Sequence, residues 1–353
     1  MKLDVPFIPN PEYAAFLAAL DERIHAVYFS LYDPNLGDAR IRMRSVAVRR
    51  MGDLLRNLSG PKKYLLANGR FQPKDRYGAD GGTADLVRQL EHLQASGNLD
   101  GIIFSDGYLL LALSDAAPDL ACRLEAVPSI NFNMDKNEKI QSVVDLIQSS
   151  RFRMPGKITL DRDMHRIPDA VSNLSKAIRR CYPATKVELL VNEGCLPRCP
   201  FRQTHEALIA AANTGLAIDS FAMNRDLGCI RMLSRSPHRI LSSPFIRPED
   251  MHHYRQDADI FKICGRTLGK DYLMRVIRAY AEGTYEGNLF DLLDASHWMA
   301  EKWELRNEDL PEDFYHRMTG CHHNCSECPG CKDLFRRLVR RRPIYIGDFD
   351  RSQ

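Results

Sequence analysis

Short apolar runs alternate with longer amphipathic segments along most of this 353-residue chain, and this alternation restricts the fold more than any other feature. Several of the longer segments have helical periodicity, at 84–95, 138–147, 169–179 and 270–281. Eight runs are typical of strands, at 25–30, 63–68, 101–105, 124–131, 157–161, 187–192, 239–242 and 259–264. Repeated strand–helix units predict an α/β fold, a closed (β/α)8 TIM-like barrel, with an open doubly wound sheet as the alternative. Pro128 predicts a short or bent fourth strand.

The alternation stops near Trp298, which predicts two parts of unequal size. Residues 1–298 form the barrel, and 299–353 form a small cysteine-rich C-terminal extension. At 44% hydrophobic residues the chain can bury one large core, and a formal net charge of +3 gives no field that indicates non-specific nucleic-acid binding. No apolar run approaches the roughly 20 residues of a membrane span, and the N-terminus lacks an apolar signal core. We therefore expect a cytoplasmic protein with no membrane partner.

Polar residues follow many of the predicted strands. In a (β/α)8 barrel the carboxyl ends of the strands build the active site, so these side chains are expected at one mouth. Each of them taken singly is also an ordinary choice for a loop or a helix N-cap, so their shared position carries more weight than any member. They are Asn68, Asp106, Asn131, Asn133, Arg162, Asn192, Glu193, Ser242, Lys262 and Arg266.

Four cysteines belong to the same predicted mouth. Cys195 and Cys199 share the loop after the sixth predicted strand, Cys229 follows in the next segment, and Cys264 ends the eighth strand. Cys264 is expected two strands away from Cys195 around a closed barrel, which is near enough for both to bind a common centre. Four thiolates from such a rim suit a [4Fe–4S] cluster. Structural zinc usually has closer cysteine pairs, and the alternative for Cys229 and Cys264 is simple burial. Cys122 and Cys181 have no nearby partner, and we assign both to packing.

A second group of cysteines lies in the extension. Cys321, Cys325, Cys328 and Cys331 fall within eleven residues with C-x3-C-x2-C-x2-C spacing, a strong metal signal by density. We expect a second iron–sulfur cluster or a zinc ion there, for electron relay or for local stapling. The first three also have the spacing of radical S-adenosylmethionine enzymes, but they come after the barrel, which disfavours that interpretation.

The barrel sequence resembles the collagenase-like peptidase U32 family. The resemblance covers most of the barrel and depends on the Glu-Leu-Leu-Val-Asn-Glu-Gly-Cys core within 187–206, on Phe-Lys-Ile-Cys-Gly-Arg at 261–266, on Ser-Ser-Pro-Phe at 242–245, and on Asp161-Arg162. It implies a [4Fe–4S] cluster on Cys195, Cys199, Cys229 and Cys264. It also implies oxygen-independent hydroxylation, with prephenate as an oxygen donor and with small molecules or RNA as substrates in different members. The cysteine-rich tail and the compact length depart from the best-known members.

The leading hypothesis is an iron–sulfur enzyme that handles an oxygen-containing group. Lys262, Arg266 and Arg162 are expected to bind a carboxylated donor, Glu193 to act as acid or base, and His165 and His205 to move protons. The alternatives are a non-catalytic cluster-bearing subunit of a heteromeric enzyme and a U32-type peptidase with a peptide substrate. A peptidase requires a nucleophile paired with a base, and the sequence offers neither a serine elbow nor a His-Glu-x-x-His motif. The basic run at 336–342 indicates a solvated helix face, and it leaves an RNA substrate open.

Overall fold

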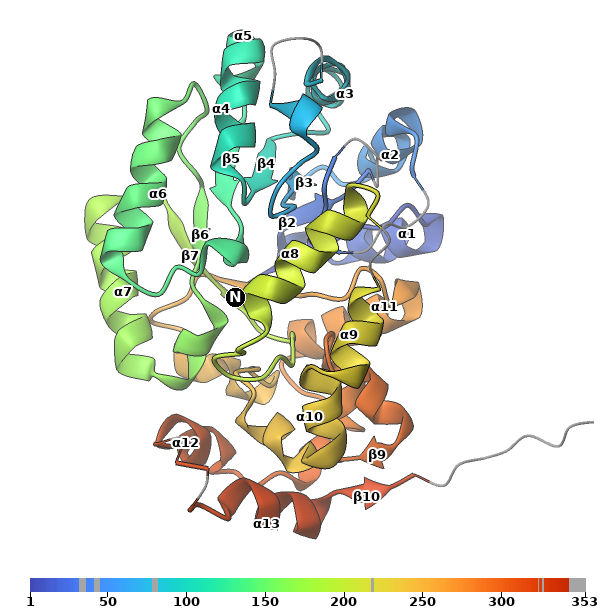
Figure 1. The fold of residues 1–353 in the computed structure, drawn as a ribbon, viewed down its shortest axis with the longest axis vertical. Coiled ribbons are helices and arrows are strands. Elements are labelled where there is room, and N and C mark those ends of the chain that lie inside the picture. Colours follow the sequence, from blue (N-terminus) through green and yellow to red (C-terminus); the bar gives the residue numbers. More distant parts are fainter. Residues whose placement is uncertain are drawn as a thin grey trace, which may run out of the picture.

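Eight parallel strands form one sheet that curves into a nearly closed barrel (Figure 1). The computed structural model describes residues 1–31, 36–40, 45–77, 82–216, 219–322, 324–325 and 327–342. The order of strands in the sheet is β5-β4-β3-β2-β1-β8-β7-β6. The strands are β1 (Lys2–Pro6), β2 (Ile24–Phe29), β3 (Lys62–Ala67), β4 (Gly101–Phe104), β5 (Glu125–Pro128), β6 (Lys157–Thr159), β7 (Lys186–Leu190) and β8 (Ile260–Lys262). The (β/α)8 prediction is confirmed.

The barrel closes at two unlike seams. β1 pairs with both β2 and β8, so the first strand of the chain joins the five-stranded part to the three-stranded part. On the opposite side, the isolated bridge between Glu125 and Arg153 joins β5 to the segment just before β6. β5 ends at Pro128, which confirms the short strand expected there, because proline has no N–H to continue a ladder.

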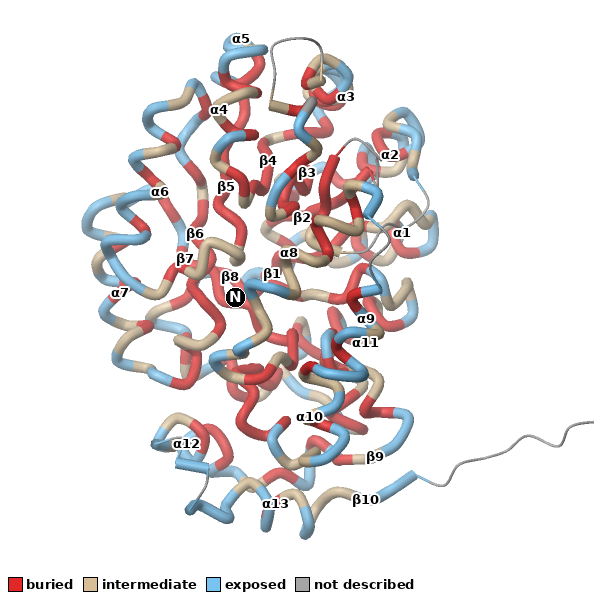
Figure 2. The backbone as a smooth tube through the Cα atoms, in the orientation of Figure 1, coloured by how far each residue is buried: buried red, intermediate tan, exposed pale blue. Residues whose placement is uncertain are grey.

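Alternation with a period of two divides the strand residues between two apolar clusters. Successive strand side chains point to opposite faces, so every second residue faces the barrel interior. The interior cluster takes Ala26, Tyr28, Tyr64, Leu66, Ile103 and Val127. The residues between them, such as Val27, Leu65 and Phe104, belong to the large cluster between the sheet and its helices. Figure 2 shows buried backbone concentrated along the strands and on the inner sides of the helices.

Charged side chains fill the rest of the interior. Lys157 on β6 is fully buried and pairs with Asp4 on β1 and with Glu188 on β7, whose carboxylate is 2.9 Å away. Lys262 on β8 lies 3.6 Å from Glu188 and 4.5 Å from the centre of the Tyr28 ring. Burial by itself raises the pKa of Glu188, but the ammonium groups of Lys157 and Lys262 outweigh it and lower this pKa. Charge pairing therefore lets ionised groups replace an apolar interior on this side.

The α-helices pack around the sheet and continue beyond it (Figure 1). The four predicted helical segments are confirmed as α3, α6, α7 and α11. The helices are α1 (Pro11–Ala19), α2 (Val48–Leu55), α3 (Ala84–Ala95), α4 (Gly107–Ala116), α5 (Pro118–Ala121), α6 (Asn137–Ser149), α7 (Pro168–Cys181), α8 (Arg202–Asn213), α9 (Ser220–Asp226), α10 (Cys229–Arg235), α11 (Gly269–Glu282), α12 (Phe314–Thr319) and α13 (Gly330–Leu338). The 3-10 turns used below are η4 (Arg162–Arg166), η5 (Pro237–Ser242) and η6 (Glu249–Tyr254).

One predicted strand is wrong and one strand was missed. The run at 239–242 lies in η5, where the Ser242 hydroxyl donates to the Arg239 carbonyl at 2.7 Å. A short apolar run does not distinguish a strand from a buried turn, and here Pro237 starts the 3-10 turn. β1 was missed because its Lys-Leu-Asp-Val-Pro sequence places a carboxylate in the middle of the strand, and the pairing of Asp4 with Lys157 and His25 makes that burial tolerable.

Residues after the barrel form a small layer at one end of the molecule (Figure 1). β9 (Trp303–Glu304) pairs with β10 (Arg340–Arg341), and α12 and α13 lie between them in the chain. α12 contacts η4 and α13 packs on η5. The basic run expected on a solvated helix begins in the last turn of α13, where Arg336 and Arg337 are exposed.

Candidate functional site

The four barrel cysteines lie on the chain segments that follow β7 and β8. Cys195 and Cys199 lie on the loop after β7, Cys264 comes two residues after β8, and Cys229 begins α10. β7 and β8 are neighbours in the sheet, so Cys195 and Cys264 are closer in topology than the two-strand separation expected from the sequence. The wrong strand at 239–242 explains that difference, because it was counted between the two strands that precede these cysteines.

Two glycines shape the chain beside these cysteines. Gly194, just before Cys195, has a φ of 72°, and a Cβ there would lie 3.0 Å from the Leu293 Cβ. Gly265, just after Cys264, has a φ of 121°, and a Cβ there would collide with the Tyr272 ring. L-residues rarely adopt such backbone angles, so glycine is required at both turns.

Three of the four thiols line one pocket of about 370 Å³ at this end of the barrel. The pocket has an apolar wall and a rim of charged groups. The apolar wall includes Leu196, Phe201, Ile209, Phe221, Ile230, Leu233, Leu268 and Trp298. The polar and sulfur-bearing lining includes Arg40, Asn131, Arg162, Glu193, Cys195, Cys199, Arg202, His205, Glu206, Asn224, Cys229 and Asp294. A concave, mainly apolar pocket with a few convergent polar groups is the usual form of a small-molecule site.

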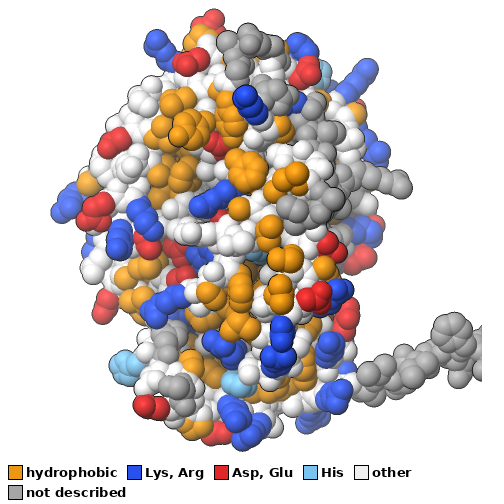
Figure 3. Space-filling model, in the orientation of Figure 1, with side chains coloured by type: hydrophobic (Ala, Val, Ile, Leu, Met, Phe, Trp, Pro, Cys, Tyr) orange, Lys and Arg blue, Asp and Glu red, His pale blue; other side chains and the backbone are white. Residues whose placement is uncertain are grey.

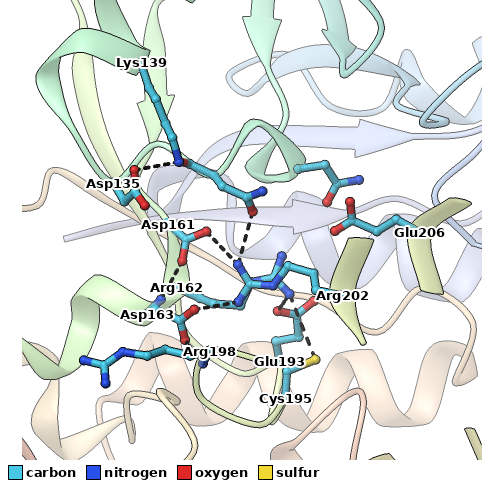
Figure 4. Close-up of polar contacts among 12 residues, drawn as sticks. Asp135, Lys139, Asp161, Arg162, Asp163, Glu193, Cys195, Arg198, Arg202 and Glu206 are labelled. Atoms are coloured by element: carbon cyan, nitrogen blue, oxygen red, sulfur yellow. Dashed lines mark hydrogen bonds and ion pairs between the residues drawn. The ribbon is translucent and has the colours of Figure 1, made fainter. Parts of the chain in front are cut away.

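Arg162 connects the first thiol to a carboxylate (Figure 4). Its guanidinium pairs with Glu193 and lies 4.0 Å from the Cys195 sulfur. Burial lowers the pKa of Arg162, but Glu193 and Cys195 more than offset this and raise it above its ordinary value. Arg162 and Glu193 were both predicted at the mouth, and both line the pocket.

Arg202 is the central residue of a second charged group, shown in Figure 4, that the sequence analysis missed. Its guanidinium donates to Asp161 at 2.8 Å, to Asp163 at 3.0 Å and to the Asn133 side chain at 3.1 Å. Asn133 accepts this bond from a left-handed conformation, with a φ of 52°. The closeness of Arg202 to Cys199 in sequence was the available signal, but its three partners come from other loops.

Arg40 and Arg70 were also missed, and both join distant segments at the pocket. Arg40 donates to Asp294 at 2.6 Å, and Cys195 and Cys264 both contribute to raising the pKa of its guanidinium. Arg40 therefore lies near both sulfur atoms, and Cys264 is at the same mouth although it does not line the pocket. Arg70, after β3, pairs with Glu206 on α8 at 2.9 Å. This ion pair ties α8 to the opposite side of the barrel mouth.

Asn192 fastens the ends of the two cysteine-bearing strands. Its amide nitrogen lies 3.1 Å from the Cys264 carbonyl, from the Tyr272 hydroxyl and from the Leu292 carbonyl. Its oxygen accepts the Cys264 N–H at 2.6 Å. The Asn192 side chain is fully buried. It was predicted to bind substrate, but in the structure it holds the backbone of Cys264 in place.

Other predicted binding residues lie in internal contacts rather than on the pocket wall. Arg266 pairs with Asp38, and Lys262 lies inside the barrel beside Glu188. The Asn68 side chain accepts the Ala39 N–H at 3.2 Å. Asp106 is the N-cap of α4 and accepts the Tyr77 hydroxyl at 2.5 Å. These residues have the structural roles that Asn and Asp commonly take at strand–helix junctions.

The two candidate histidines differ in access to the pocket. His205 on α8 lines the pocket, and its Nε2 lies 3.0 Å from the Asn224 side-chain nitrogen. Burial and the nearby Arg40 lower its pKa. His165 is fully buried, with Nδ1 3.0 Å from the Pro244 carbonyl, and burial lowers its pKa to about 4. The structure therefore brings only His205 to the thiols.

The barrel thiols are buried enough to change their acidity. Burial raises the pKa of Cys195, Cys199 and Cys229, and it raises that of Cys264 to about 12. A buried thiolate requires a positive partner, which a metal centre supplies. As the side chains stand, no group of three or more His, Cys, Asp or Glu among the described residues is positioned to hold a metal ion. The donor set thus fits soft-metal chemistry by type and location, while its side chains are not arranged as a closed site.

The cysteines outside the barrel mouth fall into two kinds. Cys331 packs against the core, and burial raises its pKa to about 11, with added contributions from Cys321, Cys325 and Cys328. Cys122 and Cys181 are exposed, which corrects their assignment to packing: each lies at the end of a helix, where its side chain faces water.

In the described part of the chain, no helix combines the length and apolar character needed to cross a membrane.

Comparison with known proteins gives one close relative among curated sequences. The chain is 30% identical over 247 residues to a protein of Methanocaldococcus jannaschii named uncharacterized protease MJ1657, with 69% of this chain and 67% of that protein covered. No family model matches the chain.

Solved structures give weaker likenesses. The U32 peptidase Mk0906 aligns with a TM-score of 0.44 at 17% identity, covering 62% of this chain and 80% of that one. The carboxyl transferase domain of Rhizobium etli pyruvate carboxylase with 3-bromopyruvate aligns with a TM-score of 0.32 at 11% identity, covering 61% of this chain and 38% of that one. Neither structural likeness bears on the chemistry of the pocket.

Proposed function

Because the chain belongs to the peptidase U32 family, we propose that it is an iron–sulfur enzyme of the oxygen-independent hydroxylase type. In this proposal Cys195, Cys199, Cys229 and Cys264 hold a [4Fe–4S] cluster at the barrel mouth. The observation that carries it is the pocket of about 370 Å³ that three of these thiols share with arginine and carboxylate side chains. When bound, such a cluster supplies an iron able to exchange a ligand and to accept or donate an electron.

The chain's own residues would bind and orient a carboxylated oxygen donor. The Nε atoms of Arg162 and Arg202 are buried and find no hydrogen-bond partner among the described residues, so each guanidinium keeps one donor in reserve. A charge-assisted hydrogen bond from a guanidinium N–H to a carboxylate is short and strong, so each arginine can hold one carboxylate oxygen. A donor that carries two carboxylates, as prephenate does, matches these two arginines better than it matches Lys262 and Arg266, which do not line the pocket.

Glu193 and His205 are the proton-transfer candidates at this pocket. Glu193 lies beside Cys195 in sequence and lines the pocket, so its carboxylate can take a proton from a bound hydroxyl or water. His205 is half-buried and hydrogen-bonded to Asn224, an arrangement that fixes its ring. The apolar wall of the pocket would exclude bulk water from the reacting groups.

A second candidate function, a thiol peptidase, is favoured by one observation. His205, Asn224 and Cys199 line the same pocket, and a cysteine, a histidine and an orienting amide are the elements of one peptidase mechanism. Against it, no hydrogen bond joins the His205 ring to a thiol among the described residues, so the cysteine and the histidine are not paired. The two functions assign different roles to the same cysteines, so they can be separated by experiment.

The test is anaerobic purification followed by quantification of iron and acid-labile sulfide. The wild-type barrel should hold about four iron and four sulfide ions. Cys195→Ser and Cys229→Ser should lose them, whereas Cys122→Ser, which changes an exposed thiol outside the mouth, should keep them. Equal iron in all four proteins would refute the barrel cluster.

Peptidase activity should be measured on the same proteins with casein and with a fluorogenic peptide library. We expect no hydrolysis by wild type, and no difference between wild type and His205→Gln. Hydrolysis that disappears in His205→Gln, in a protein that contains no iron, would establish the peptidase instead.

If RNA is the substrate, its binding should weaken steeply between low and moderate salt, because phosphate contacts release counterions.

A further inference from the structure

The tail cysteines form a second cluster of thiols that the proposed function of the barrel does not use. Cys321, Cys325 and Cys328 lie on the loop between α12 and α13, and Cys331 lies in the first turn of α13. The Gly330 N–H donates to the Cys328 sulfur at 3.4 Å. The four sulfur atoms therefore belong to one eleven-residue stretch that runs from the end of α12 into the first turn of α13.

Packing does not account for two of these four residues. Cys331 contacts the hydrophobic core, but Cys325 and Cys328 are exposed, in a loop whose other described residues are mostly exposed as well. A cysteine behaves as a small apolar residue, so burial would be the ordinary reason for its presence. Exposed thiols close to one another instead indicate a role that depends on sulfur chemistry.

The thiol loop connects two short helices that dock on different parts of the barrel (Figure 1). On α12, the Phe314 ring lies 6.1 Å from the Phe245 ring and 5.9 Å from the Arg166 guanidinium of η4. On α13, Leu334 is buried, and the helix packs on η5. Helices of six and nine residues are not stable alone, so their positions depend on these contacts and on the loop between them.

Arg166 of η4 connects α12 to the barrel. Its guanidinium donates twice to the Ser243 carbonyl, at 2.6 and 3.2 Å, and lies 5.2 Å from the Phe245 ring. The same 3-10 turn begins at Arg162, which contacts Cys195 and Glu193 in the pocket. One five-residue turn therefore has the pocket at one end and the docked tail at the other.

We propose that Cys321, Cys325, Cys328 and Cys331 bind one thiophilic metal centre that holds α12 and α13 together on the barrel. Four thiolates are the ligand set shared by structural zinc and by iron–sulfur clusters. As they stand, the described side chains do not enclose a metal position, so binding requires the exposed thiols of Cys325 and Cys328 to change position. Metal binding would close the loop between α12 and α13, and its free energy would stabilise the docked tail.

The test compares metal content and tail stability in the full-length protein. Cys325→Ser and Cys328→Ser change exposed residues, so the barrel should still fold, and Cys122→Ser and Cys181→Ser are matched controls because they also change exposed thiols. All five proteins are purified anaerobically, and their zinc, iron and sulfide are quantified. Limited proteolysis then measures cleavage between α12 and α13.

Both tail variants should lose one metal centre and should be cleaved several-fold faster in the tail, while both controls match wild type. Loss of zinc alone identifies a single ion, and loss of iron together with sulfide identifies a cluster. Tail variants that keep the full metal complement of the wild type overturn the proposal, as does a disulfide between tail cysteines in the anaerobic protein. Barrel iron that depends on Cys195 should be unchanged in both tail variants, so failure here is distinct from failure of the proposed enzyme.

Discussion

Replacement of Asn192 by alanine tests whether this side chain supports Cys264 or binds substrate. The Asn192 amide nitrogen has two hydrogens for three nearby acceptors, and its oxygen accepts one N–H, so about three full hydrogen bonds are lost. At about 1 kcal/mol each, Asn192→Ala should lower the free energy of unfolding by about 3 kcal/mol. The Cys264 N–H and carbonyl lose these contacts, so the iron content should fall as well.

The assay is urea unfolding followed by circular dichroism, with iron measured on the same preparations. Asn57→Ala is the control, because Asn57 is exposed, and it should change the free energy of unfolding by less than about 0.5 kcal/mol. Asn192→Asp keeps an acceptor but loses both donors and places a charge beside carbonyl oxygens, so it should destabilise at least as much as alanine. A loss below about 1 kcal/mol with unchanged iron would refute a structural role for Asn192.

Two further predictions concern the charged barrel interior. Lys157→Met removes the ammonium that the buried carboxylates of Asp4 and Glu188 share, which leaves Asp4 with His25 and Glu188 with Lys262, and should cost about 3 kcal/mol in urea unfolding. Lys139→Met, which breaks the surface pair with Asp135, should cost less than about 1 kcal/mol. Equal costs would show that the interior charges are not coupled. Burial lowers the pKa of His25 to about 4, so the unfolded chain binds the extra proton first, and stability should fall as pH drops from about 6.5 toward 4. His25→Gln should flatten this part of the curve of unfolding midpoint against pH, and an unchanged slope would contradict the assignment.

The barrel was predictable because its signal is local and repeated. Runs such as 63–68 and 101–105 are apolar on both faces, as strands covered inside and outside must be, and most lie within a residue or two of the observed bounds. β1 and the turn at 239–242 were predicted wrongly because their structure does not depend on a local signal. Whether Asp4 is buried, or whether Ile240 belongs to a turn, is decided by partners far away in the chain.

The site was predictable only where a residue's chemistry does not depend on its neighbours. Residues that follow the carboxyl ends of barrel strands lie at the mouth. This rule predicted the positions of Cys195 and Cys264, and also those of Arg162 and Glu193. Arg40, Arg70 and Arg202 were not found, because an arginine on a loop shows no periodicity, and their partners lie between 39 and 254 positions away. Asn192 and Arg266 were correctly placed after their strands, but their hydrogen-bond and ion-pair partners were invisible in the sequence.

The seam between β1 and β8 has a consequence for synthesis of the chain on the ribosome. β1 leaves the ribosome before the other seven strands of the sheet, yet one of its two neighbours ends at Lys262. At roughly 5–20 residues per second, the outer edge of β1 waits on the order of 10–50 seconds for that neighbour to be translated. During this interval the nascent five-stranded half presents an unpaired edge, a known template for aggregation, so holdase chaperones should bind it before release.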